Sequence, residues 1–161
     1  MAMSNVSPAP SLLQFRRARR EDVPAIVALL ADDAIGAARE GLGDIFPDAY
    51  WQAFASIDAD PHELLTVIDD GGTILGTLQI TFVRSLSRRG SERAIIEAVR
   101  VRSDRRGQGL GRQFVNWAIE RARERGCKIV QLTTDKRRTD AHRFYVSLGF
   151  AATHEGMKLE L

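Results

Sequence analysis

Apolar residues recur at helical spacing in four segments of the chain. The strongest pattern covers Gly109–Arg125, with Gly126 as its C-cap. Its apolar face would consist of Leu110, Phe114, Trp117, Ala118 and Ala122. The same spacing predicts a helix that starts at the N-cap Asp22, a short helix over Pro47–Ile57 and a helix over Thr139–Leu148.

Six further segments are rich in apolar and β-branched residues and are bounded by turn residues, which predicts strands. These segments are Leu12–Ala18, Leu64–Ile68, Ile74–Val83, Arg93–Arg102, Lys128–Thr134 and Met157–Leu161. The polar connection SLSRRGSE between the third and the fourth favours a hairpin. Because helices and strands alternate in the second half, the order predicts one α/β (α+β) domain with a mixed sheet.

The composition agrees with a single globular domain. Of the 161 residues, 44% are hydrophobic and 27% are charged, so we expect one domain over residues 12–161 after a flexible tail at 1–11. The longest apolar run, Val23–Ala31, is too short to span a bilayer. The single cysteine, Cys127, excludes an internal disulfide and a multi-cysteine metal site, so we expect no metal and a reducing, cytoplasmic location.

Charge is distributed unevenly along the chain. Residues 1–80 contain 5 basic and 12 acidic residues, whereas residues 81–161 contain 18 basic and 9 acidic residues. A basic second half favours an anionic ligand such as a phosphate-rich cofactor, although a solvated charged surface would give the same count. We expect no nucleic-acid partner, because the arginines cluster at one loop and no recognition motif is present.

The segment VRVRSDRRGQGLGR, Val99–Arg112, carries the candidate chemistry. A predicted strand runs into Gly107, Gly109 and Gly111, which open the long helix. Glycines let a ligand approach the backbone closely, and the unpaired N–H groups of a helix start bind phosphate. The spacing matches neither GxxxxGK[ST] nor GxGxxG, so a pyrophosphate site and a tight turn without a ligand both stay open at this point.

Two motifs resemble those of the GNAT superfamily of N-acetyltransferases. Arg106-Gly107-Gln108-Gly109-Leu110-Gly111 resembles the acetyl-CoA signature (Gln/Arg)-x-x-Gly-x-(Gly/Ala), and Ala141–Phe150 resembles the segment A-x-x-F-Y-x-x-x-G-F. The string DAHRFY is also similar to that of aminoalkylphosphonate N-acetyltransferases. The resemblance covers about residues 12–161. It implies a GNAT-like mixed sheet of about six to seven strands flanked by about four helices, with a splay between the middle strands.

The resemblance also implies where the cosubstrate acetyl-CoA would bind. Its pantetheine arm would pair with the backbone of Val99 and Val101. Its pyrophosphate would lie on the loop formed by Arg106, Gly107, Gln108, Gly109, Leu110, Gly111 and Arg112. Many members carry an asparagine seven residues before the tyrosine of the second motif, where this chain has Arg138.

Acetyl transfer needs a neutral amine and therefore a proton acceptor. Glu97 is the candidate base, because the two-residue period of a strand places it on one face with Ile95, Val99 and Val101, where we expect partial burial. The structural alternative is a salt bridge at the sheet edge to a neighbouring arginine. The alternative base is Asp135 or an ordered water.

The departing thiolate needs a proton donor. Tyr145 matches the tyrosine that has this role in many members of the superfamily, and a phenol can donate to a thiolate of similar pKa. Its spacing alone would make it a buried aromatic residue on the core face of its helix.

The resemblance implies a small-molecule primary amine as the acceptor. The acidic connection after the first helix holds Asp32, Asp33, Glu40, Asp44 and Asp48 beside Phe46, Tyr50 and Trp51, which would suit a cation. The hairpin residues Arg84, Arg88, Arg89 and Arg93 would instead suit an acidic group. A protein or peptide N-acetyltransferase and a non-catalytic acyl-CoA sensor are the alternative functions, and a homodimer stays open.

Overall fold

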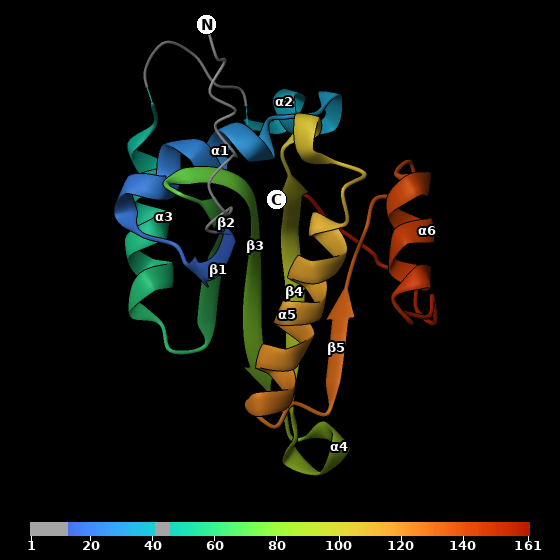
Figure 1. The fold of residues 1–161 in the computed structure, drawn as a ribbon. Helices are drawn as coiled ribbons and strands as arrows, with labels where there is room; N and C mark the ends of the chain where they lie inside the picture. The colour runs from blue at the N-terminus through green and yellow to red at the C-terminus, as the bar shows by residue number, and fades with distance from the viewer. Residues whose placement is uncertain (1–12, 41–45) are drawn as a thin grey trace, which may run out of the picture.

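The computed structural model describes residues 13–40 and 46–161, in which five strands form one sheet in chain order (Figure 1). The strands are β1 (Leu13–Arg17), β2 (Glu63–Asp70), β3 (Thr73–Arg84), β4 (Glu92–Val101) and β5 (Ile129–Leu132). All neighbours pair antiparallel except β4 and β5, which are parallel. The predicted mixed sheet is confirmed, and the predicted tail at 1–11 lies outside the described residues.

Six α-helices are described, where about four were expected. They are α1 (Val23–Leu30), α2 (Ala34–Glu40), α3 (Asp48–Ala59), α4 (Ser87–Gly90), α5 (Leu110–Glu124) and α6 (Thr139–Ser147), with single 3₁₀ turns η1 (Arg20–Asp22) and η2 (Ser103–Arg105). The helix α2 has no counterpart among the predicted helices. It contains Gly36, whose N–H donates to the Asp33 carboxylate at 2.8 Å and where a Cβ atom would meet the Leu30 carbonyl at 2.0 Å.

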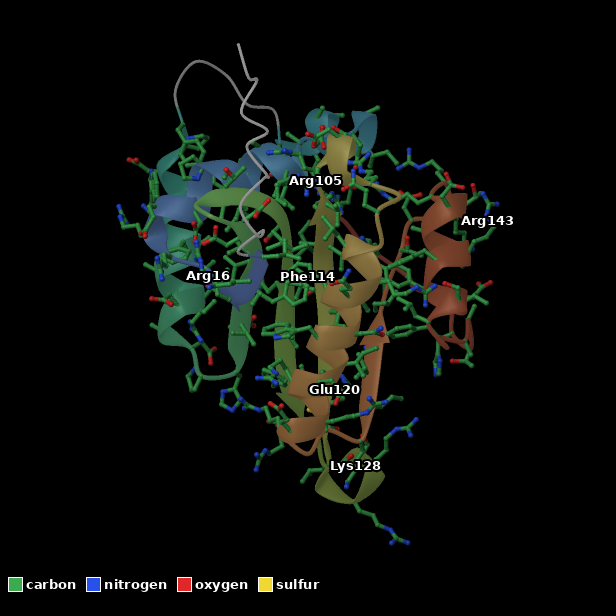
Figure 2. The ribbon with its side chains drawn as sticks, in the orientation of Figure 1. Arg16, Arg105, Phe114, Glu120, Lys128 and Arg143 are labelled. Carbon is green, nitrogen blue, oxygen red and sulfur yellow. The ribbon has the colours of Figure 1, made fainter. Side chains whose placement is uncertain are left out.

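The two faces of the sheet carry separate hydrophobic clusters. On one face, Leu78, Ile80 and Ile96 pack against Phe114 and Val115 of α5, and Figure 2 shows the labelled Phe114 between this helix and the strands. On the other face, Val67 packs with buried residues of α1 and α3. Helices therefore cover both faces, with the sheet between them.

The strands β4 and β5 separate before β4 ends. Their pairing covers only Arg93–Ile96 against Ile129–Leu132, whereas β4 continues to Val101. The last five residues of β4 thus have no strand partner on this side. This is the splay expected between the middle strands, and it leaves backbone N–H and C=O groups facing the gap.

The C-terminal segment does not form the predicted strand. Met157 and Leu159 are 95% and 85% exposed, and residues 151–161 are all exposed. A Cβ atom on Gly156 would lie 4.0 Å from Thr133, so the segment passes the end of β5 without pairing with it. The sheet accordingly has five strands in the described residues, and the expectation of six to seven was wrong.

None of the helices in residues 13–40 and 46–161 is both long and apolar enough to cross a membrane. The same residues contain no group of three His, Cys, Asp or Glu side chains that could hold a metal ion.

Candidate active site

The glycine-containing loop lies directly before α5 and has the geometry of an anion site. Gly107 and Gly109 adopt the left-handed backbone region, with φ of 75° and 79°, which non-glycine residues rarely adopt. The first helical hydrogen bond of α5 runs from the Gln113 N–H to the Gly109 carbonyl, at 3.1 Å. The preceding N–H groups at the start of this 15-residue helix therefore have no helical acceptor.

An open hollow of about 270 Å³ lies at this loop. The residues around it are Val101, Arg105, Arg106, Gly107, Gly109, Gly111, Arg112 and Phe144. Figure 2 shows the labelled Arg105 at the end of the sheet where β4 leads into α5. Three arginines and a row of N–H groups at a helix start fit a pyrophosphate. Five of the seven predicted loop residues thus line the hollow, whereas Gln108 does not and the side chain of Leu110 is buried in the core.

Two arginines of the loop also tie it to the rest of the fold. Arg106 donates from Nε to the Val101 carbonyl at 2.9 Å and from Nη2 to Asp32 at 3.2 Å, and Asp32 also accepts from the Ser103 N–H at 2.9 Å. Arg112 donates to the Ser147 hydroxyl at the end of α6 at 2.8 Å. The loop therefore contacts the connection between α1 and α2 through Asp32 and contacts α6 through Ser147.

Glu97 lies at the mouth of the splay, one residue after the last pair between β4 and β5. Its side chain is exposed, so the expected partial burial is wrong. The described ion pairs include none to Glu97, so the alternative of a salt bridge is not observed either. The carboxylate is accessible to a bound amine.

A β-bulge at Ala98 explains why the expected strand face is wrong. Gln79 pairs with Glu97, but Thr77 pairs with Arg100, so one extra residue is inserted in β4. Ala98 has φ of 53°. The insertion places Arg100 on the face of Glu97, whereas Val99 and Val101 pack in the cluster of α5 on the opposite face.

Tyr145 is on α6, which lies beside β5 in Figure 1. Its ring packs against Phe144 and Phe150, with centroid distances of 5.1 and 5.8 Å. Burial raises the pKa of Tyr145, and the positive charges of Arg100 and Arg138 offset part of this effect. The hydroxyl is therefore neutral at physiological pH and able to donate a proton.

A group of charged side chains faces the same region, and we call it the acceptor-side cluster: Asp33, Arg39, Glu40, Arg100 and Arg138. Arg138 donates to both Asp33 oxygens, at 2.8 and 2.9 Å. Hydrogen bonding by Arg138 holds the pKa of Asp33 well below its usual range. This bidentate pair links the α1–α2 junction to the loop before α6, and it gives a role to the arginine that replaces the usual asparagine.

The second carboxylate of the cluster is also paired. Glu40 accepts from the Tyr50 hydroxyl at 2.7 Å and from Arg39 at 3.0 Å. Burial alone would raise the pKa of Glu40, but these two hydrogen bonds outweigh it and lower the pKa. Three acidic residues of the connection are thus paired, Glu40 with Arg39, Asp33 with Arg138 and Asp32 with Arg106. No ion pair is described for Asp48, and Asp44 lies outside the described residues.

The hairpin between β3 and β4 does not form a wall of the site. Its tip is α4, at the opposite end of the sheet from η2 and the glycine loop (Figure 1). Arg84, Arg88 and Arg89 are exposed, and Arg84 pairs with Glu92 at 3.7 Å, whereas Arg93 is half-buried. Of the two alternatives for the substrate that stayed open, the position of this hairpin does not favour the one in which its arginines bind an acidic group.

The alternative base Asp135 is poorly suited to accept a proton. Arg137 donates to its carboxylate at 2.7 and 3.0 Å. These hydrogen bonds hold the pKa of Asp135 well below its usual range, and a low pKa makes a weak base.

Arg100 is the main residue of the site that sequence reasoning missed. The pattern VRVR at 99–102 shows only that arginines and valines alternate. The face that each side chain occupies depends on the bulge at Ala98, which no turn residue marks in the sequence.

The comparisons with known proteins agree with this geometry. Residues 23–150 match the model of the family described as Acetyltransferase (GNAT) family. The chain is 28% identical over 141 residues to an aminoalkylphosphonate N-acetyltransferase of Salmonella typhimurium, which covers 88% of this chain and 86% of that protein.

Solved structures are similar over most of the chain. A protein of Bacillus halodurans C-125, described as a transcriptional regulator, is 49% identical with a TM-score of 0.89, over 92% of this chain and 99% of that chain. A putative acetyltransferase of Agrobacterium tumefaciens is 28% identical with a TM-score of 0.80 over the same shares.

Proposed function

The chain belongs to the GNAT family of acetyltransferases, and on this premise we propose that it transfers an acetyl group directly from acetyl-CoA to a primary amine of a small molecule. The observation that carries the proposal is the junction of three features. The glycine loop at the start of α5, the open end of β4 and the Tyr145 helix meet around one hollow.

The chain would hold the cosubstrate with its backbone. The N–H groups from Arg106 to Gly111 and the arginines beside them bind the pyrophosphate. The stretch of β4 at Val99 and Val101, which has no β5 partner, would pair with the amides of the pantetheine arm. When bound there, acetyl-CoA supplies the acetyl thioester.

Two side chains move the protons of the reaction. Glu97 accepts a proton from the substrate ammonium, directly or through a water, so that the neutral nitrogen can form its bond to the acetyl carbon. As the carbon–sulfur bond breaks, the Tyr145 hydroxyl gives its proton to the sulfur. The nitrogen then loses a second proton as it becomes an amide, and the Tyr145 phenolate takes it up. The proton on Glu97 leaves to solvent, so that one proton is released overall.

The paired charges of the acceptor-side cluster support a small-molecule acceptor over a peptide. The pair of Arg138 with Asp33, at 2.8 and 2.9 Å, links the α1–α2 junction to the loop before α6. The Salmonella relative is named for small amines, which supports the same class. A cytoplasmic location is proposed with it.

A thiol-release assay with acetyl-CoA over a panel of primary amines tests the proposal. We expect release of CoA that depends on the amine, together with the acetylated product by mass spectrometry. Acetyl-CoA binding without turnover of any amine would favour the acyl-CoA sensor. The description of the Bacillus halodurans protein as a transcriptional regulator makes that alternative worth this test.

A further inference from the structure

Arg100 occupies a buried position in the stretch of β4 that has no β5 partner. Only 14% of its side chain is exposed. Because of the bulge at Ala98, it lies on the same strand face as Glu97. Glu97 and Arg100 lie opposite Gln79 and Thr77, which are two residues and therefore about 7 Å apart along β3. A short organic molecule can span this separation.

Most N–H donors of Arg100 have no acceptor in the described residues. A guanidinium has five N–H groups. In the described residues, the side chain of Arg100 donates one hydrogen bond, from Nη1 to the Val99 carbonyl at 2.9 Å. The buried Nε has no hydrogen-bond partner. Its distance of 3.7 Å to Asp33 is too long for a hydrogen bond.

The neighbouring carboxylates are already neutralised by other arginines. Both oxygens of Asp33 accept from Arg138, and Glu40 accepts from Arg39 and Tyr50. The acceptor-side cluster contains three arginines and two carboxylates, which leaves one positive charge on the buried Arg100. Burial accordingly lowers the pKa of Arg100. A buried charge that lacks partners is destabilising unless an ion of opposite charge joins it.

We propose that Arg100 binds an acidic group of the acceptor, so that the substrates are short-chain primary amines that carry a carboxylate, phosphonate or phosphate. This inference rests on the proposed function. Two oxygens of the acid would accept from the Nε and Nη2 groups, which form the fork that guanidinium presents to such anions. The amine at the other end of the molecule would then lie near Glu97.

The test compares acceptors that share an amine and differ in the acid. 2-Aminoethylphosphonate and β-alanine carry the acid, and β-alaninamide does not. We expect the native enzyme to prefer both acids. Arg100→Gln should lower kcat/KM for the acids roughly 10–100-fold, mainly through KM, and change kcat/KM for β-alaninamide less than about threefold. Arg100→Lys should lose roughly tenfold for the acids, because it keeps the charge without the fork.

Arg102→Gln is the matched control. Arg102 lies two residues further along and its guanidinium pairs with Asp104 at 2.6 Å, so its loss should not alter the preference. Thermal midpoints and CoA affinity of each variant separate a folding defect from a binding defect. An equal fall for acids and amide in Arg100→Gln, or no native preference for the acids, would overturn the role of Arg100.

A binding measurement keeps this inference separate from the proposed function. Calorimetry of the CoA-bound protein with 2-aminoethylphosphonate should detect binding that Arg100→Gln weakens by at least tenfold. If no amine is acetylated but this binding is present, the proposed reaction is wrong and the anion site stands. If the native protein does not bind the phosphonate or β-alanine, the anion site is wrong.

Discussion

Tyr145 shows how one residue can combine a packing role with a chemical one. Its ring packs against Phe144 and Phe150, and burial raises the pKa of its hydroxyl while the positive charges of Arg100 and Arg138 lower it. The aromatic contacts fix the ring, and the arginines would stabilise the phenolate that forms when the proton leaves. The two roles can be separated because they use different atoms of the side chain.

Tyr145→Phe removes the hydroxyl and keeps the ring. If Tyr145 is the general acid, kcat should fall roughly 10²–10⁴-fold, because the thiolate then leaves without a proton. Acetyl-CoA affinity and the thermal midpoint should stay close to native values, since no described hydrogen bond of the hydroxyl is lost. Steady-state kinetics and calorimetry check this, and a fall of less than about threefold would leave Tyr145 with its packing role alone.

Glu97→Gln keeps the size of the side chain and removes its ability to accept a proton. Activity of the variant should rise steeply with pH toward the amine pKa near 10, where the substrate is neutral without help. The native enzyme should be flatter above about pH 7. The pH profiles of kcat/KM for both proteins decide this, and parallel profiles would assign the base to Asp135 or an ordered water.

Asp135→Asn serves as the control for that experiment. Arg137 already holds Asp135 as an ion pair, so the substitution should leave the pH profile unchanged. A profile that shifts in Asp135→Asn and not in Glu97→Gln would exchange the roles of the two residues.

At the scale of elements, the two ends of α5 offer a controlled test of the pyrophosphate site. Gly109 lies at its start with φ of 79°, and Gly126 lies after its end with φ of 84°. Aspartate at either position would have the same backbone strain, but only the first places a negative charge on the row of unpaired N–H groups.

Both substitutions should lower the thermal midpoint by a similar amount. Gly109→Asp should in addition weaken CoA binding by at least tenfold, whereas Gly126→Asp should leave CoA affinity unchanged. A Cβ atom at Gly109 meets only the flexible end of Gln113 at 4.0 Å, so the effect would not come from a steric clash within the protein. Calorimetry with CoA and thermal unfolding of both variants test this. Equal CoA affinities would remove the loop from the binding site.

The elements with a strong local pattern were predictable from the sequence. The five observed strands and the helices α1, α3, α5 and α6 all overlap predicted segments, because their apolar periodicity directly reflects burial. The extra helix α2 depends on a cap from Asp33 and on close packing at Gly36. Such contacts depend on the packed fold, and a local pattern does not contain them.

The site was predictable in part for the same reason. The glycine loop is a continuous string of residues and could be located from sequence. The acceptor-side cluster draws Asp33, Arg100 and Arg138 together from positions up to 105 residues apart. The Met157–Leu161 segment has the alternation of a strand, yet no described strand pairs with it. Alternation predicts a strand only where a partner is present.

At the scale of the whole molecule, one buried network of ion pairs connects the strands β1 and β2 to the 3₁₀ turn η1. Arg16 of β1 donates to Asp22 at 2.7 and 3.0 Å and to Asp69 of β2 at 2.7 Å. Asp22 is 5% exposed and also accepts from the Arg19 N–H at 2.7 Å. Its side chain thus binds β1 and η1, where a cap of α1 had been expected.

Asp22→Asn should lower the free energy of unfolding by about 3 kcal/mol at pH 7, because it leaves Arg16 with one partner fewer in a buried setting. Burial alone would raise the pKa of Asp22, but hydrogen bonds from Arg16 and Arg19 lower it overall. The stability that this carboxylate contributes is therefore complete above the unfolded pKa near 3.9 and is lost as pH falls through the folded value.

Urea unfolding of the native protein and the variant, at intervals between pH 7 and pH 3, measures this contribution. The difference in free energy should narrow as the pH falls toward 3. A constant difference across this range would show that the loss comes from packing and not from the charge of Asp22.

The inserted residue in β4 determines how deletion of one codon would affect the two faces of this strand. Deleting Ala98 would restore a regular ladder in which Glu97, Val99 and Arg100 lie opposite Gln79, Leu78 and Thr77. Arg100 would therefore keep the strand face that it shares with Glu97, and Val99 would keep the opposite face. A single-codon deletion at this position would thus remove the bulge without exchanging the two faces of the strand, and the left-handed backbone at Ala98 would be lost with it.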